Sequence, residues 1–128
     1  MKKFHLLLLL IPLTLIACST EEAEKLADEY HKKLQAEQDE YIVDHLVDPE
    51  QLSLDGRDAW LGLFDLVHSW GKITNVTKSM GFHKNYNNGV TTVDLDYELE
   101  FEPRLTVQEK ISLIDRGDGY KVWGVEYN

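Results

Sequence analysis

Few side chains in this sequence of 128 residues are of types that could support nucleophilic or metal chemistry. Cys18 is the only cysteine, and a single thiol excludes both an internal disulfide and a metal site built on several thiolates. The histidines beyond the first twenty residues are His31, His45, His68 and His83. No two of them have the i, i+4 spacing of a helical metal pair. We therefore expect no metal site and no cofactor, and histidines at surface or core positions.

The residues before Cys18 indicate what its thiol does. Lys2 and Lys3 form a short positive segment, and residues 4–17 are almost wholly apolar. This stretch is shorter than the roughly 20 residues that span a bilayer, but it suits the core of a secretory signal peptide. The run Leu15-Ile16-Ala17-Cys18 that ends it resembles the lipobox of bacterial lipoproteins.

The lipobox resemblance implies a specific modification. The thiol of Cys18 would accept a diacylglyceryl group as a thioether, cleavage would follow the small Ala17, and the new amino group would be acylated, typically with palmitate. Two or three acyl chains anchor a protein stably, at about 0.8 kcal/mol per buried methylene. The alternatives are an ordinary secreted protein with a stray cysteine, or an uncleaved anchor. In a Gram-negative source, Ser19 implies the inner leaflet of the outer membrane, facing the periplasm; otherwise the anchor would sit on the outer face of the cytoplasmic membrane.

Length and charge limit what the remaining chain can be. Cleavage would leave residues 18–128, enough for one domain with a single core. Without Lys2 and Lys3 the net charge changes from −10 to −12. This acidic balance argues against nucleic acid as a partner, because phosphates need a basic face. A hydrophobic fraction of 43% is too high for a disordered chain.

The segment after the cysteine is predicted to be helical over residues 20–48. Ser19 and Glu22 have capping-box spacing. The apolar pattern shifts near Gln38-Asp39, which predicts a break into a second, short helix over 40–47 that ends at Pro49. The apolar positions that keep one helical face in register are Ala23, Leu26, Ala27, Tyr30, Leu34 and Tyr41.

A further helix is expected between Asp55 and Gly71. Asp55 is a plausible N-terminal cap, and Gly71 supplies a C-terminal stop. Its buried face follows the i, i+3, i+4, i+7 pattern of Trp60, Leu63, Phe64 and Val67.

After Gly71 the hydrophobic period changes to two, which predicts four antiparallel strands. Their expected ranges are 72–80, 90–102, 105–115 and 120–127. Residues 85–89 form the first turn, with Asn88-Gly89 a strong hairpin signal. The sequence therefore predicts an α+β fold in which N-terminal helices pack on one face of a curved four-stranded antiparallel sheet.

The second predicted strand carries alternating apolar and acidic residues. The apolar face must turn toward the helices, because each large side chain left in water costs about 1.5–3 kcal/mol. This face is Val93, Leu95, Tyr97, Leu99 and Phe101, and the outer row is Asp94, Asp96, Glu98, Glu100 and Glu102. We expect the row to be a solvated face with lysines opposite, such as Lys110 and Lys121; the alternative is a recognition surface for a basic partner.

The inward faces also bear on catalysis. Tyr97 offers the only polar atom of the central inward row, and the next strand repeats the apolar pattern, broken only by Glu109. We take this as evidence against a catalytic aspartate between the sheet and the helices.

This order of elements resembles the cystatin-like, or nuclear-transport-factor-two-like, cone fold, and more narrowly small bacterial lipoproteins of unassigned function with that domain. The resemblance covers most of residues 21–127. It rests on Trp60, Gly71 and the runs 93–97, 109–113 and 119–124. Enzymes of this superfamily, such as ketosteroid isomerase, place acids and bases between sheet and helices, but the fold also hosts binding and dimerisation domains.

Three hypotheses follow for function. The first is a non-enzymatic, membrane-anchored envelope lipoprotein that binds a protein partner or a small apolar ligand. The second is an acid–base enzyme using Tyr97, Asp65 or His68. The third is a structural or assembly protein that dimerises through the outer face of its sheet. Candidate pocket-lining residues are Tyr30, Trp60, Phe64, His68, Tyr97 and Trp123.

Overall fold

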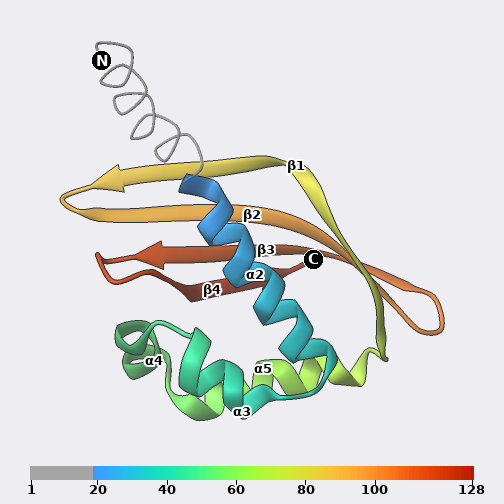
Figure 1. The fold of residues 1–128 in the computed structure, drawn as a ribbon. Helices are drawn as coiled ribbons and strands as arrows, with labels where there is room; N and C mark the ends of the chain where they lie inside the picture. Colours follow the sequence, from blue (N-terminus) through green and yellow to red (C-terminus); the bar gives the residue numbers. More distant parts are fainter. Residues whose placement is uncertain (1–18) are drawn as a thin grey trace, which may run out of the picture.

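The structure is a computed structural model that describes residues 19–128 of the chain. Helices come first and an antiparallel meander of four strands follows, with strand order β1-β2-β3-β4 (Figure 1). The predicted α+β class is therefore confirmed. Cys18 lies outside the described residues, as does the side chain of Ser19 that was expected to cap the first helix.

The long helix α2 (Ser19–Gln35) forms as the sequence predicts. Glutamates occupy its first turn and lysines its last, which suits the helix dipole. Its buried face consists of Ala23, Ala27, Tyr30, His31 and Leu34. The chain then breaks at Glu37, whose φ is +56°, close to the predicted position. The short α3 (Asp39–Tyr41) continues into a π-helical turn, η1 (Ile42–Leu46).

Pro49 begins a helix that the sequence analysis did not anticipate. Helix α4 (Pro49–Asp55) has Pro49 in its first turn, where the missing N–H costs nothing. Asp48 caps it by accepting a hydrogen bond from the Gln51 N–H. The prediction took Pro49 only as the end of the preceding helix. A proline can equally occupy the first turn of the next helix, and the residue type alone does not distinguish the two positions.

Helix α5 (Arg57–Ser69) buries Trp60, Phe64 and Val67, as predicted, whereas Leu63 of the predicted face is only half-buried. The prediction that Asp55 caps this helix is wrong. Gly56 holds the cap position with φ +90°, and the Asp55 carboxylate instead accepts a hydrogen bond from the Trp60 indole N–H at 3.1 Å. The helix ends before Gly71, as expected. Gly71 has φ +119°, and a Cβ at this position would lie 2.0 Å from the Glu102 carbonyl oxygen.

The three later strands match their predicted ranges within one residue: β2 (Val90–Phe101), β3 (Leu105–Asp115) and β4 (Tyr120–Tyr127). The first strand is longer than predicted. β1 (Ile73–Asn87) continues past Met80 through residues 85–87, which the prediction assigned to a turn, so that the turn is only Asn88-Gly89. The polar composition of 83–87 concealed a strand that is exposed at the edge of the sheet.

The faces of β2 are as expected. Val93, Leu95, Tyr97, Leu99 and Phe101 are buried, while the alternate acidic residues are exposed or half-buried. Lys110 lies directly across from Asp96. The expectation for Lys121 is wrong: its ammonium donates to the His45 carbonyl oxygen at 2.8 Å instead of facing the acidic row.

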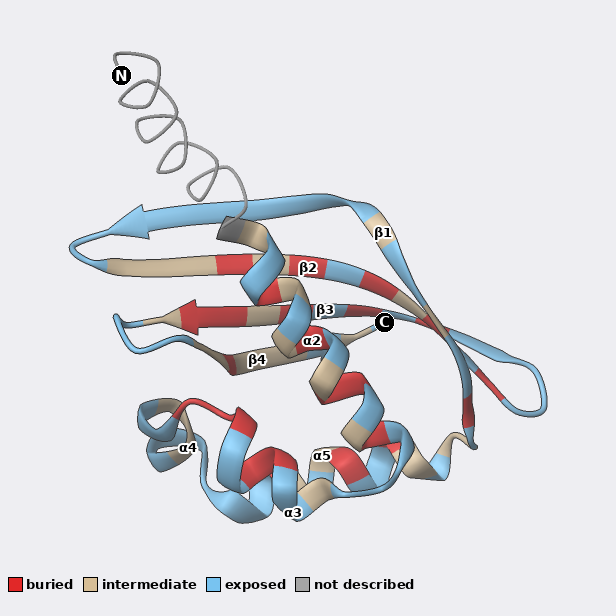
Figure 2. Cartoon of the chain, viewed as in Figure 1, coloured by how far each residue is buried: buried red, intermediate tan, exposed pale blue. Residues whose placement is uncertain are grey.

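The core lies between one face of the sheet and the helices. Helix α2 starts beside β1 and β2, crosses the strands and ends next to α5 (Figure 1). The buried positions of α2 and α5 face the buried stretches of β2 and β3 (Figure 2). A parallel bridge between Val47 and Val122 joins the segment before α4 to the edge strand β4. At the end of the sheet that carries the β1–β2 and β3–β4 hairpins, the strands extend past the start of α2 (Figure 1), and a concave surface lies between that part of α2 and the strand ends.

Candidate functional site

A buried polar cluster joins α2 to the middle of the sheet. The His31 Nε2 lies 2.6 Å from the Glu109 Oε1, and the two residues are only 3% and 2% exposed. Glu109 pairs across the sheet with Tyr97, and therefore shares its inward face. The Tyr97 ring also packs edge-on against the His31 imidazole, with centroids 4.5 Å apart.

Two further tyrosines extend this cluster. The hydroxyls of Tyr30 on α2 and Tyr127 on β4 are hydrogen-bonded at 3.1 Å. Burial, reinforced by nearby acidic groups, raises the pKa values of Tyr30 and Tyr127 well above the usual value. Burial likewise raises the pKa of Tyr97, with smaller contributions from Asp28, Glu24 and Glu109. These phenols therefore stay protonated at neutral pH.

The hollows around this cluster do not reach its polar atoms. Neither His31 nor Glu109 lines any of the cavities described below for residues 19–128. An acid–base pair needs a substrate within hydrogen-bond reach to act as a catalyst. We therefore interpret the cluster as a structural contact that holds α2 across the strands.

The concave surface near the hairpins forms an open groove of about 470 Å³, a volume in the range of ligand sites. One wall is the first part of α2, with side chains at the i, i+3, i+4, i+7 spacing that defines one helical face: Glu22, Lys25, Leu26 and Glu29. The floor and far wall come from the strand ends: Lys84, Thr91, Asp115, Gly119 and Tyr120. The lining combines charged side chains of both signs with the apolar Leu26 and the ring of Tyr120.

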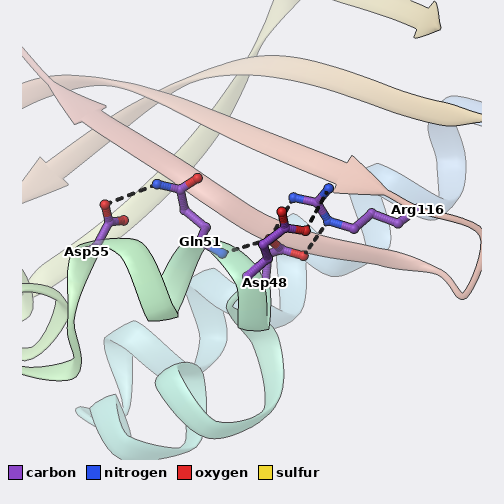
Figure 3. Close-up of polar contacts among 5 residues, drawn as sticks. Asp48, Gln51, Asp55 and Arg116 are labelled. Atoms are coloured by element: carbon purple, nitrogen blue, oxygen red, sulfur yellow. Dashed lines mark hydrogen bonds and ion pairs between the residues drawn. The ribbon is translucent and has the colours of Figure 1, made fainter. Parts of the chain in front are cut away.

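A side-chain clamp holds the β3–β4 hairpin at the edge of this groove (Figure 3). Arg116 donates from Nε and Nη2 to the two carboxylate oxygens of Asp48, at 3.1 and 3.0 Å. Arg116 also pairs with Glu50 at 3.1 Å. The hydrogen bonds from Arg116 are the main cause that lowers the pKa of Asp48. The hairpin residues that follow Arg116 include Gly119, so the clamp fixes part of the groove wall.

The residues predicted to line a pocket do not share one. Tyr30, Phe64 and Tyr97 are buried in the core. Trp60 is nearly buried against Phe64 and borders a hollow of about 280 Å³ between α5 and β4. Trp123 is half-buried on β4.

The other candidate acid–base residues lie away from the buried cluster. His68 borders a separate hollow with Gly71 and Lys72, where its Nε2 contacts the Asp39 carboxylate at 2.8 Å. Asp65 is exposed on α5 and lines a shallow hollow with Asp39.

The sequence analysis missed both the His31–Glu109 contact and the groove. The first had a signal, because His31 follows Ala27 by four residues on the buried face of α2 and Glu109 lies in an inward register. The groove had none, since its walls come from segments far apart in the chain. Its lining depends on where α2 stops covering the sheet.

Two further properties concern the described residues. Within residues 19–128, no group of three or more metal-ligating side chains is placed to hold an ion. No helix in this part of the chain is long and apolar enough to cross a membrane.

The chain matches no protein-family model, and no curated protein matches it.

Proposed function

We propose that this chain is a bacterial envelope lipoprotein, anchored through Cys18, whose domain binds a protein partner in the concave groove without catalysing a reaction. The observation that carries the proposal is the lipobox-like run at 15–18 followed at once by a folded element, since α2 begins at Ser19. An anchor at Cys18 would hold the domain directly against the bilayer, with no intervening linker. Ser19 favours the inner leaflet of a Gram-negative outer membrane, or otherwise the outer face of the cytoplasmic membrane.

The cystatin-like or nuclear-transport-factor-two-like cone is part of this proposal. A long helix crossing one face of a four-stranded meander supports it. The groove lies between a helix and the sheet, and the resemblance implies that a cone of this kind would take a ligand between these layers.

The chemistry of the groove favours a protein segment over a small apolar ligand. Glu22, Glu29 and Asp115 are acidic, while Lys25 and Lys84 are basic. An apolar ligand would strip water from these charges without compensating them. A peptide segment with charges of both signs could pair with them and would leave the apolar Leu26 as a central contact.

The other two hypotheses receive less support. The acid–base hypothesis named Tyr97, Asp65 and His68, and these residues do not share a cavity: Tyr97 is buried, while Asp65 and His68 border separate hollows. Dimerisation through the outer sheet face would bring the acidic rows of two copies together, at the cost of like-charge repulsion.

The anchor is tested by Cys18→Ser in the source cells. We expect wild-type protein in the membrane fraction, with a mature mass that includes the diacylglyceryl group and starts at residue 18. The Cys18→Ser variant should lack that mass and should remain unprocessed or leave the membrane fraction. Processing and membrane retention identical to wild type would contradict the proposal.

The groove is tested by site-specific photocrosslinking in intact envelopes. A photoreactive residue at position 26 should give a discrete crosslinked protein, while one at Leu66, exposed on α5, should not. Glu29→Lys should weaken the adduct at position 26 by reversing one wall charge. Equal crosslinking at both positions, or none at position 26, would exclude the groove as the binding surface.

A further inference from the structure

The segment 72–89, which contains β1, has a charge opposite to that of the rest of the protein. It contains Lys72, Lys78, His83 and Lys84 and no acidic residue, in a chain with 23 aspartates and glutamates. The neighbouring strand β2 carries the acidic row on its outer face. An otherwise acidic domain therefore has one basic edge.

The same strand exposes the most prominent apolar side chains of the sheet. Met80 is 98% exposed, Phe82 56% and Tyr86 70%. Most of β1 is open to solvent, whereas β2 and β3 are buried along much of their length (Figure 2). Exposed apolar groups that cluster with lysines and an aromatic hydroxyl are typical of surfaces that contact a membrane interface.

A bulge projects part of this surface outward. Lys78 pairs with Tyr97, and Phe82 pairs with Leu95. Between these two pairs β1 advances by four residues while β2 advances by two. Bulges at sheet edges re-aim side chains and interrupt further strand pairing. The extra residues surround Met80, which explains its exposure. They also make this edge a poor template for adding another strand, which argues against a second β-strand as its occupant.

The basic edge lies beside the start of α2. The Lys78 ammonium contacts the Glu24 carboxylate at 3.2 Å, and Lys84 lines the groove together with Glu22 and Lys25. Both contacts fall in the first two turns of α2. Because an α-helix rises about 1.5 Å per residue, they lie within roughly 10 Å of Ser19 along the helix axis. Figure 1 likewise places the start of α2 next to β1, on the side of the sheet away from α3 and α5.

From these observations we propose that residues 78–86 of β1 contact the surface of an anionic phospholipid bilayer. This inference rests on the proposed anchor at Cys18, which would bring this edge of the domain to the membrane. Met80 and Phe82 would enter the interfacial region, Tyr86 would lie at headgroup level, and the net positive charge of the segment would favour the negatively charged lipid surface. The contact would orient the domain.

The test uses the purified, lipidated full-length product reconstituted into vesicles. Because the Cys18 sulfur is then a thioether, Met80→Cys introduces the only reactive thiol, which is labelled with an environment-sensitive fluorophore. Leu54→Cys on α4, 77% exposed, is the matched control on a different face. Vesicles contain either phosphatidylcholine alone or phosphatidylcholine with phosphatidylglycerol, and both carry a lipid-attached quencher.

We expect the probe at position 80 to brighten and to be quenched in the phosphatidylglycerol vesicles, while the probe at position 54 remains in water. Neutralising Lys84 (Lys84→Gln) should lower the ratio of membrane-bound to free probe about fivefold. Equal quenching at positions 80 and 54, or none at position 80, would overturn the proposal. If the protein labelled at position 80 can be crosslinked to a second copy and its fluorophore is not quenched by the lipid-attached quencher, the edge is a self-association surface. That result would also overturn the proposal.

Failure of the anchor is distinguishable from failure of this contact. Mass spectrometry of the purified protein reports the lipid on Cys18 before reconstitution. A product without that lipid refutes the anchor and, with it, this inference. A lipidated product whose probe at position 80 stays in water refutes only the membrane contact of β1.

Discussion

His31 on α2 and Glu109 on β3 touch across a sequence separation of 78 residues, with His31 Nε2 2.6 Å from Glu109 Oε1. Both side chains are almost fully enclosed. The contact fixes where the long helix crosses the sheet, and therefore where the sheet is left open to form the groove.

Replacing either partner of this contact should destabilise the fold strongly. Removing one member of a buried hydrogen-bonded pair typically costs about 1–3 kcal/mol, because the other remains desolvated and unpaired. His31→Leu and Glu109→Leu should each show this loss in urea unfolding. The double variant should lose much less than the two single losses combined. Additive losses would mean that the two side chains contribute independently.

Removing the hydroxyl should have different effects on the free energy of unfolding for two tyrosines of the cluster. The Tyr97 hydroxyl is buried and has no hydrogen-bond partner among the described protein groups. Tyr97→Phe should therefore leave the free energy of unfolding unchanged or raise it by about 1 kcal/mol. Tyr30→Phe removes the 3.1 Å hydrogen bond to Tyr127 and should lower it by about 1 kcal/mol. A larger loss for Tyr97→Phe than for Tyr30→Phe would contradict this interpretation.

The charge of Asp48 should give the protein a specific acid sensitivity. Its folded-state pKa is lowered, mainly by hydrogen bonds from Arg116. Its stabilising contribution is therefore present above the unfolded pKa of about 3.9 and is lost as the pH falls through the lower folded value. Asp48→Asn keeps a capping side chain but removes the charge, and should cost about 1–2 kcal/mol at pH 7.

The control for this prediction is the pH dependence itself. The stability difference between wild type and Asp48→Asn should shrink below about pH 4, as measured by urea unfolding over a pH series. A difference that stays constant down to about pH 2 would show that the charge of Asp48 contributes nothing.

Two glycines provide a matched pair of backbone tests. Gly71→Ala would place a Cβ 2.0 Å from the Glu102 carbonyl oxygen at a φ of +119°, and should cost several kcal/mol or prevent folding. Gly62→Ala, inside α5 with no atom within 4 Å of the new Cβ, should stabilise by about 0.5–1 kcal/mol. Thermal unfolding measures both. A neutral Gly71→Ala would refute the close approach of Gly71 to the end of β2.

Much of the fold was predictable because local periodicity and turn chemistry determine it. The alternation of Val93, Leu95 and Tyr97 with acidic residues established both the strand and its buried face. Asn88-Gly89 located the hairpin turn. The exposed edge strand was harder to delimit, because residues 83–87 have little to bury and so carry no alternation.

Helix boundaries around α4 show the limit of local signals. Asp48 and Asp55 are both reasonable caps by residue type, and only the structure decides between them. Asp48 caps α4 while it binds Arg116 from the distant hairpin. Asp55 accepts from the Trp60 indole instead. The choice depends on tertiary partners that no short window of sequence contains.

The sequence alone determined the α+β order of elements, the acidic outer face of β2 and the lipobox-like run at Cys18, since each depends on neighbours along the chain. The tertiary structure alone decided that His31 meets Glu109 and that α2 leaves one end of the sheet uncovered. It also placed the basic edge of β1 beside the start of α2. The physical reason is that these features arise from packing between segments distant in sequence, where burial and excluded volume, rather than local propensity, select the arrangement.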